Sequence, residues 1–160
     1  MSRSGRVIHK KEILPDPIYQ SKLLSKFVNQ LMKQGKKSVA RKILYDSLEI
    51  IKNDEKKDPL EVFETAVKNT GPKMEVRPRR VGGASYQVPM EVRGSRKESL
   101  AIRWLIAAAD KRPNKEFHTM AAKLAAEFRA AYQNSGEAIK KRDDTHRMAD
   151  ANKAFAHFRW

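Results

Sequence analysis

The chain has 160 residues, enough for one domain with one hydrophobic core, and it contains no cysteine, which excludes disulfides and cysteine-ligated metal sites. Its 34 Lys and Arg residues exceed its 19 acidic residues, and the formal net charge of +15 favours a polyanionic partner, nucleic acid first and an anionic membrane surface second. Apolar runs stay well short of the roughly 20 residues that a membrane-spanning helix needs, and the N-terminus lacks the apolar stretch of a secretory signal.

Residues 1–20 predict a basic N-terminal arm. Pro15 and Pro17 flank Asp16, and two prolines so close together prevent a continuous helix. We expect this arm to be irregular and to become ordered when it contacts its partner. Its basic side chains are Arg3, Arg6, His9, Lys10 and Lys11.

Three helices are expected between residues 21 and 72. The first repeats apolar residues on one face and ends at Gly35, a residue type that commonly caps helix C-termini, and the second spans about 37–52. The third opens with a capping box at Asp58 and stops at Gly71. The expected inward residues are Leu24, Phe27, Val28, Leu31, Met32, Ala40, Ile43, Leu44, Leu48, Ile51, Leu60, Phe63 and Val67.

Residues 73–93 follow the two-residue period of strands. Gly82-Gly83 in their middle is a strong turn signal. Pro78 and Pro89 each remove a hydrogen-bond donor, so neither strand belongs inside a wide sheet. The pattern predicts a two-stranded arm that projects from a helical body.

Three further helices are expected after the arm. Ser95 and Glu98 predict a capping box for the fourth helix, the fifth spans about 115–132, and the sixth runs from near Ser135 toward Met148. The inward residues would be Ala101, Trp104, Leu105, Ala108, Phe117, Met120, Ala121, Leu124, Ala125 and Phe128.

The predicted fold class is therefore mainly α: a bundle of about six helices with a protruding two-stranded β-ribbon arm between the third and fourth helices. The predicted organisation is a basic arm at 1–20, a helical RNA-binding domain at 21–148 and a C-terminal segment at 149–160. That last segment has helical spacing without a clear end signal.

The arm carries Arg77, Arg79 and Arg80 before the glycine pair and Tyr86 after it. Arginine offers a planar fork of donors that matches phosphate oxygens, and a thin basic ribbon has the right shape to reach into folded RNA. The alternative is a solvated hairpin that is basic for solubility. Because a two-stranded ribbon is marginally stable alone in water, the sequence favours a partner.

Two further basic segments are candidates for contact with phosphate. Lys36 and Lys37 lie where one helix ends and the next begins, a place that attracts anions. The string GKKS lacks the first glycine of a P-loop, so nucleotide hydrolysis is not expected. At the C-terminus, basic residues alternate with Phe155, Phe158 and Trp160, which suit either stacking on bases or filling a core, and both interpretations stay open.

Acidic residues concentrate in the second and third helices, so this region should face away from RNA. They are Asp46, Glu49, Asp54, Glu55, Asp58, Glu61 and Glu64. The four histidines are widely separated, without metal-ligand spacing. Asp143, Asp144 and His146 could be imagined as a general-base set, but a charged helix surface explains them more simply. We expect no catalytic site, metal or cofactor.

Long strings of the sequence resemble the family of small-subunit ribosomal protein seven, of the bacterial and organellar type, over nearly the full chain. The strings are LPDP at 14–17, KFVN at 26–29, GKKS with the apolar pair Ile43-Leu44 at 35–44, RRVGGASYQVP at 79–89 and HRMADANKAFAHFRW at 146–160. Such strings are far more specific than composition.

The resemblance implies a helical bundle with a β-ribbon that binds the 3′ major domain of small-subunit rRNA, nucleates assembly of the head and lies beside the exit-site tRNA and the mRNA. It also implies contact with neighbouring head or platform proteins. Carried over by position, the rRNA-binding residues would be Arg3, Arg6, Lys10, Lys11, Lys36, Lys37, Arg77, Arg79, Arg80, Arg96 and Lys115. The exit-site residues would be Val81, Gly82, Gly83, Tyr86 and Arg147.

Two other classes of protein share the charge. A DNA-binding or chromatin-like protein would prefer duplex DNA to structured RNA, and a membrane-surface protein would need an amphipathic helix with a basic polar face. Neither class explains the long strings. The expected location is the ribosome of the cytoplasm, or of an organelle if the gene is organellar.

Overall fold

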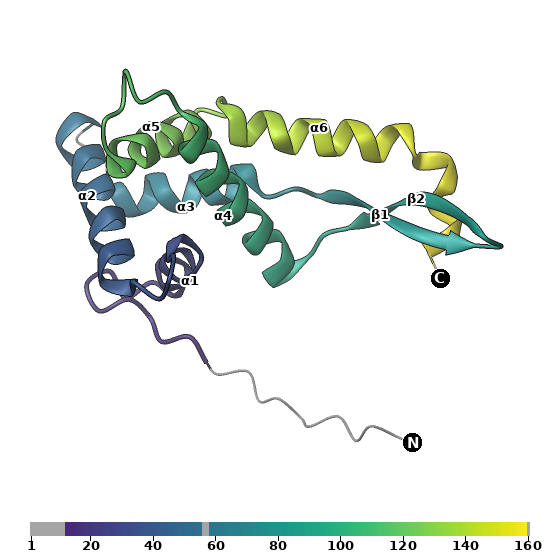
Figure 1. The fold of residues 1–160 in the computed structure, drawn as a ribbon, viewed down its shortest axis with the longest axis horizontal. Coiled ribbons are helices and arrows are strands. Elements are labelled where there is room, and N and C mark those ends of the chain that lie inside the picture. Colours follow the sequence, from purple (N-terminus) through teal and green to yellow (C-terminus); the bar gives the residue numbers. More distant parts are fainter. Residues whose placement is uncertain (1–11, 56–57, 160) are drawn as a thin grey trace.

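The computed structural model describes residues 12–55 and 58–159, which form a helical body with a long projection (Figure 1). The predicted residues Arg3, Arg6, His9, Lys10, Lys11 and Trp160 lie outside the described residues. The elements are α1 (Lys22–Leu31), α2 (Lys37–Glu55), α3 (Pro59–Thr70), β1 (Met74–Val81), β2 (Ala84–Glu91), α4 (Gly94–Lys111), α5 (Met120–Tyr132), α6 (Glu137–Ala151) and the 3-10 helix η1 (Lys153–Arg159). The predicted fold class is confirmed: the chain is mainly helical, with a two-stranded antiparallel ribbon between α3 and α4.

Three fully buried phenylalanine rings mark the centre of the body. Phe27 of α1, Phe63 of α3 and Phe128 of α5 meet edge to face, with ring centroids 5.4 to 5.5 Å apart. This geometry brings the positive edge of one ring onto the negative face of the next. The helical period predicted all three rings as inward residues, and their burial confirms that prediction.

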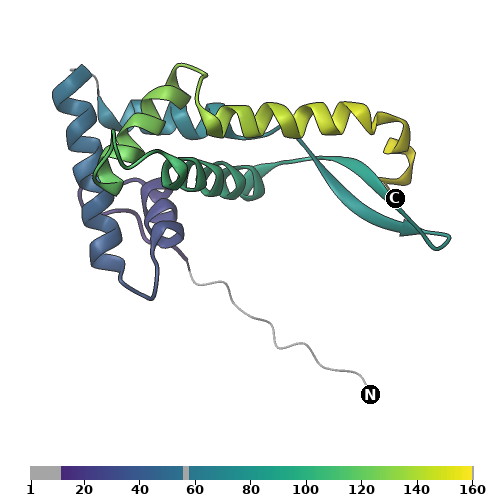
Figure 2. The same cartoon turned by 45° about the horizontal axis from the view of Figure 1, so that its top comes forward.

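The projection consists of the ribbon and α6, which extend side by side from the body, while α1 and α2 lie at the opposite end (Figure 1 and Figure 2). After α6 the chain turns back and η1 packs on β2. The long α6 therefore supports a ribbon that would otherwise stand alone in solvent.

The register of the ribbon follows from its turn. Gly82 and Gly83 have φ of +58° and +89°, left-handed values that glycine adopts without strain, and they join Val81 directly to its partner Ala84. Pro78 lies opposite Gln87. A proline without a backbone N–H is tolerated there because the sheet has only two strands, so both are edge strands. The predicted turn and both strands are confirmed.

Two predicted helix starts are wrong. The capping box at Ser95 is not formed: α4 begins at Gly94, whose φ of +53° lets the chain turn into the helix one residue earlier, and Glu98 instead forms an ion pair with Lys26 of α1 at 2.5 Å. The fifth helix begins at Met120, not near 115, because the hydroxyl oxygen of Thr119 accepts the N–H of Ala122 and caps it there.

The first helix also ends earlier than expected. It stops at Leu31, and Gln34 and Gly35, with φ of +54° and +75°, form a left-handed turn that leads into α2. Gly35 therefore directs the connection between two helices and does not cap the first. By contrast, the predicted cap at Asp58 is confirmed, since its carboxylate accepts the N–H of Leu60 at 3.0 Å.

The segment before α1 is anchored by one buried carboxylate. Asp16 is 2% exposed and accepts hydrogen bonds from the Tyr45 hydroxyl of α2 at 2.8 and 2.9 Å and from the N–H groups of Ile18 and Tyr19. The chain turns directly after it, at residues 17–19, where the N–H of Gln20 donates to the carbonyl oxygen of Asp16 at 2.9 Å. The described part of the predicted arm is thus irregular, as expected, but it is packed against the body.

Candidate nucleic-acid interface

The predicted rRNA-binding arginines at the base of the ribbon share one carboxylate. Glu75 of β1 is buried, and its two oxygens accept hydrogen bonds from Arg77 of the same strand and from Arg96 in the first turn of α4. The Arg96 Nη2 to Glu75 Oε2 distance is 3.0 Å. Each guanidinium keeps about half of its side chain exposed, so Glu75 fixes both arginines in position while their outer faces stay open.

Toward the tip, strand geometry separates the arginines that the sequence places together. Successive side chains of a strand point to opposite faces of the ribbon. Arg79, opposite Tyr86, therefore lies on the same face as Arg77, whereas Arg80, opposite Ser85, lies on the other face. Arginines therefore lie on both faces of the ribbon, and the face of Arg79 is also the one on which Tyr86 packs against η1.

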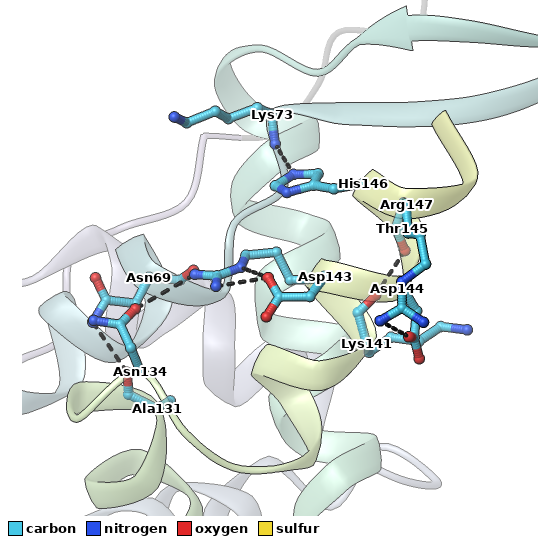
Figure 3. A network of polar contacts seen from close by, with 11 residues as sticks. Asn69, Lys73, Ala131, Asn134, Lys141, Asp143, Asp144, Thr145, His146 and Arg147 are labelled. Atoms are coloured by element: carbon cyan, nitrogen blue, oxygen red, sulfur yellow. Dashed lines mark hydrogen bonds and ion pairs between the residues drawn. The ribbon is translucent and has the colours of Figure 1, made fainter. Parts of the chain in front are cut away.

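The root of the ribbon is fixed by a polar network from α6 (Figure 3). The Nη1 group of Arg142 donates to the carbonyl oxygen of Asn69 at the end of α3, at 2.7 Å, and Nε donates to Asp143 at 2.8 Å. The amide of Asn69 in turn donates to the carbonyl oxygens of Ala131 and Tyr132 in α5. Three helices are thereby joined at the point where the chain leaves the body for the ribbon.

His146 completes this network one turn further along α6. Its Nε2 accepts the backbone N–H of Lys73, the residue before β1, at 2.9 Å (Figure 3). A ring nitrogen can accept only when it carries no proton, so the contact needs the neutral ring. Burial, reinforced by the positive charge of Arg142, lowers the pKa of His146 below its usual value and favours that neutral form.

Asp143, Asp144 and His146, considered above as a general-base set, each contact a different structural partner. Asp143 pairs with Arg142, Asp144 lies 3.5 Å from Arg147, and His146 holds Lys73. These side chains face different partners along the helix, as residues so close in a helical sequence must. In the described ranges 12–55 and 58–159, no group of three His, Asp or Glu residues could hold a metal ion.

The far end of the projection is held by an aromatic cluster that we call the latch, formed by Tyr86, Phe155 and Phe158. The ring of Tyr86 on β2 lies 5.4 Å from that of Phe155 and 5.1 Å from that of Phe158, both on η1. Of the two interpretations that the sequence left open, packing is the one these rings adopt. The predicted exit-site residue Tyr86 is half-buried against them.

The remaining predicted residues lie at four separate places. Lys36 and Lys37 are exposed at the α1–α2 turn of the body, Lys115 is exposed in the loop before α5, and Arg147 is exposed on α6 near the ribbon. Val81, Gly82 and Gly83 form the tip of the ribbon. The structure thus brings Arg96 to the base of the ribbon, while Arg147 stays on α6 and the two lysine sites belong to the body.

Sequence reasoning missed Glu127, which is 1% exposed in α5. Its carboxylate accepts Arg112 at 2.8 and 2.9 Å and the backbone N–H of Ala138 at 3.0 Å, so it also caps α6. Gly136 is required beside it, because a Cβ there would lie 3.0 Å from a Glu127 oxygen. A Glu on a mostly apolar helix face is the signal that the sequence offers.

The acidic side chains form a different surface. Asp46 and Glu49 line a shallow groove of about 400 Å³ between α2 and α5, with Ile43, Ile50 and Met120. The helix α2, which carries both carboxylates, lies at the end of the body that is remote from the ribbon tip (Figure 1). Among the described residues, no helix is long and apolar enough to cross a membrane.

Comparison with known proteins agrees with this architecture. The family model described as ribosomal protein S7p/S5e matches residues 2–153. The chain is 57% identical to the small ribosomal subunit protein uS7 of Syntrophomonas wolfei and 57% identical to that of Thermodesulfovibrio yellowstonii, each over 160 residues and 100% of both chains. With the uS7 protein of Clostridium acetobutylicum the identity is 52% over the same span. The chain therefore belongs to the ribosomal protein S7p/S5e family.

Proposed function

We propose that this protein of the small ribosomal subunit binds the 3′ major domain of the subunit's rRNA, nucleates assembly of the head and lines the tRNA exit site, with no catalytic role. The observation that carries the proposal is the basic ribbon, which α6 and the latch support outside the body. A supported ribbon with arginines on both faces is built to enter folded RNA.

Two groups of residues would divide the work. The proposed rRNA-binding group clamps the RNA from the body and from the ribbon through Lys36, Lys37, Arg77, Arg79, Arg80, Arg96 and Lys115, together with Arg3, Arg6, Lys10 and Lys11 of the N-terminal arm. The proposed exit-site group consists of Val81, Gly82, Gly83, Tyr86 and Arg147 at the far end of the projection. There the exit-site tRNA and the mRNA would pass, and neighbouring head or platform proteins would make contact.

The charge distribution supports this division. Asp46 and Glu49 line a groove between α2 and α5, away from the ribbon, so their carboxylates are remote from phosphate that binds at the ribbon. Glu75 neutralises part of the charge of Arg77 and Arg96 but leaves each side chain about half exposed. The arginines are positioned before RNA arrives, so less side-chain entropy is lost on binding.

The test is the salt dependence of binding to a transcribed 3′ major domain. If roughly 6 to 10 phosphates are neutralised, the affinity should fall by about 10³- to 10⁵-fold between about 50 and 200 mM salt. Duplex DNA of equal length serves as the competitor and should displace the rRNA poorly. A flat salt response, or equal competition by duplex DNA, would contradict the proposal.

A further inference from the structure

A groove of about 630 Å³ lies on the body between the segment before α1, α1 itself and α2, and it contains none of the proposed exit-site residues. Its main lining residues are Leu14, Pro15, Pro17, Asn29, Lys37 and Arg41. We propose that this groove binds an unpaired nucleotide of RNA, with a phosphate on Arg41 and the base against Leu14. The inference rests on the proposed function and adds a subsite to it.

Arg41 is the residue that points to a ligand. Its Nε is buried and has no hydrogen-bond acceptor, and no carboxylate of the described ranges forms an ion pair with it. Arg112, in comparison, is satisfied by the buried Glu127. Arg41 lines the groove and lacks the carboxylate partner that Arg112 has, so its guanidinium is a cation that a phosphate entering the groove would pair with.

The opposite wall is apolar and held in place. Leu14 is 79% exposed although it lines the groove, so a base lying against it would remove apolar surface from water. The wall cannot drift, because Asp16 between the two prolines is bound by the Tyr45 hydroxyl at 2.8 and 2.9 Å. The groove is therefore formed before any ligand enters it.

The chemistry of the lining favours RNA over an acidic protein segment. Lys37 and Arg41 supply two cations against the single carboxylate of Glu12, which suits a phosphate group. Asn29 adds an amide, whose donor and acceptor can pair with a base edge. Unpaired nucleotides are recognised by this combination of phosphate contact, base-edge hydrogen bonds and an apolar face.

The test compares Arg41→Ala with Lys42→Ala for binding to the transcribed 3′ major domain. Lys42 is exposed on the next position of α2 and does not line the groove, so both variants lose one positive charge from the same helix. We expect Arg41→Ala to weaken binding by about 10- to 100-fold, through lost charge-assisted hydrogen bonds. Lys42→Ala should weaken binding by less than about fivefold.

A second variant guards against a failure of Arg41→Ala to fold. Leu14→Ala changes an exposed side chain, so its melting temperature should match wild type, and RNA affinity should fall roughly threefold or more. Equal effects of Arg41→Ala and Lys42→Ala would overturn the proposal, as would unchanged affinity of Leu14→Ala. Normal RNA binding with poor incorporation into the subunit would instead indicate an acidic protein segment and would also overturn it. Wild-type protein that does not bind the rRNA would refute the proposed function itself.

Discussion

Tyr86 on the ribbon and Phe158 on η1 have ring centroids 5.1 Å apart, so a residue that the sequence suggested for RNA contact also joins the C-terminal segment to the arm. Phe155 lies on the same ring at 5.4 Å. The ribbon is consequently held at both ends, by the α6 network at its root and by the latch near its tip. Its orientation is a property of the free protein.

Removal of the latch should loosen the ribbon while leaving the body intact. Each aromatic pair contributes about 0.5–1.5 kcal/mol beyond burial, so Phe158→Ala should lower the hydrogen-exchange protection of ribbon amides by roughly 2- to 10-fold. Protection of α1 and α3 amides is the internal control and should not change. Unchanged protection of the ribbon would show that α6 alone orients it.

Glu127→Ala should be strongly destabilising. The substitution leaves Arg112 without its buried partner and removes the acceptor for the Ala138 N–H at the start of α6. Breaking a buried pair of this kind costs about 3–5 kcal/mol, to be measured by urea unfolding. Glu137→Ala is the matched control: its ion pair with Lys140 is exposed at 3.7 Å and contributes less than about 1 kcal/mol. Equal losses in the two variants would contradict the assignment.

His146 makes stability depend on pH. Burial and the charges of Arg142 and Lys73 lower its pKa, against the opposite effect of Asp143 and Asp150. Because the pKa is lower in the folded chain, the unfolded chain binds the proton first as the pH falls below about 6.5. The stabilisation is therefore complete above that pH and is lost as the pH falls through the folded pKa.

The experiment compares the free energy of unfolding at pH 7 and pH 5 for wild type and for His146→Gln. Glutamine offers an oxygen to the Lys73 N–H but does not titrate in this range, so the variant should lose less stability at pH 5 than wild type does. The carboxylates titrate in both proteins and cancel in the difference. Identical losses would mean that the histidine ring remains neutral or exposed in both states.

Tyr45 should be recognisable by its titration. Burial and the hydrogen bond to Asp16 raise the pKa of Tyr45 to about 12. Since the folded pKa is raised, its stabilisation is present below the ordinary pKa of about 10 and is lost as the pH rises through the folded value. Ultraviolet absorbance should show a tyrosinate that forms near pH 12 in wild type and is missing in Tyr45→Phe. Loss of these bonds should also lower stability by about 1.5–3 kcal/mol.

Local patterns were sufficient to predict most of the fold. Apolar residues at helical spacing identified the buried faces that carry Phe27, Phe63 and Phe128, and the glycine pair at 82 and 83 identified the ribbon. These signals depend only on near neighbours in the chain, so they can be read without knowing the tertiary arrangement.

Contacts between distant residues were beyond that reasoning. Lys26 and Glu98 are 72 residues apart. Glu98 forms this ion pair, and the capping box that the sequence predicted for it is not formed. Lys73 and His146 are 73 residues apart, and nothing near either residue indicates the other. The latch, the α6 network and the Glu127 cluster all depend on which helices and strands pack together, and the periodic pattern of a single sequence shows the buried faces but not their partners.

Substitution of the ribbon arginines should change RNA affinity without changing the stability of the fold. Arg79→Ala with Arg80→Ala should reduce the slope of log affinity against log salt by about 2, because each lost phosphate contact removes roughly 0.9. The matched control removes two other exposed charges, Arg93→Ala with Arg103→Ala, and should leave the slope nearly unchanged. Melting temperatures of both double variants should stay within about 3 °C of wild type, since surface changes are usually within about 0.5 kcal/mol. A large drop in the melting temperature of the ribbon variant would mean that these arginines hold the ribbon together. Equal slopes for the two variants would mean that the ribbon arginines do not contact phosphate.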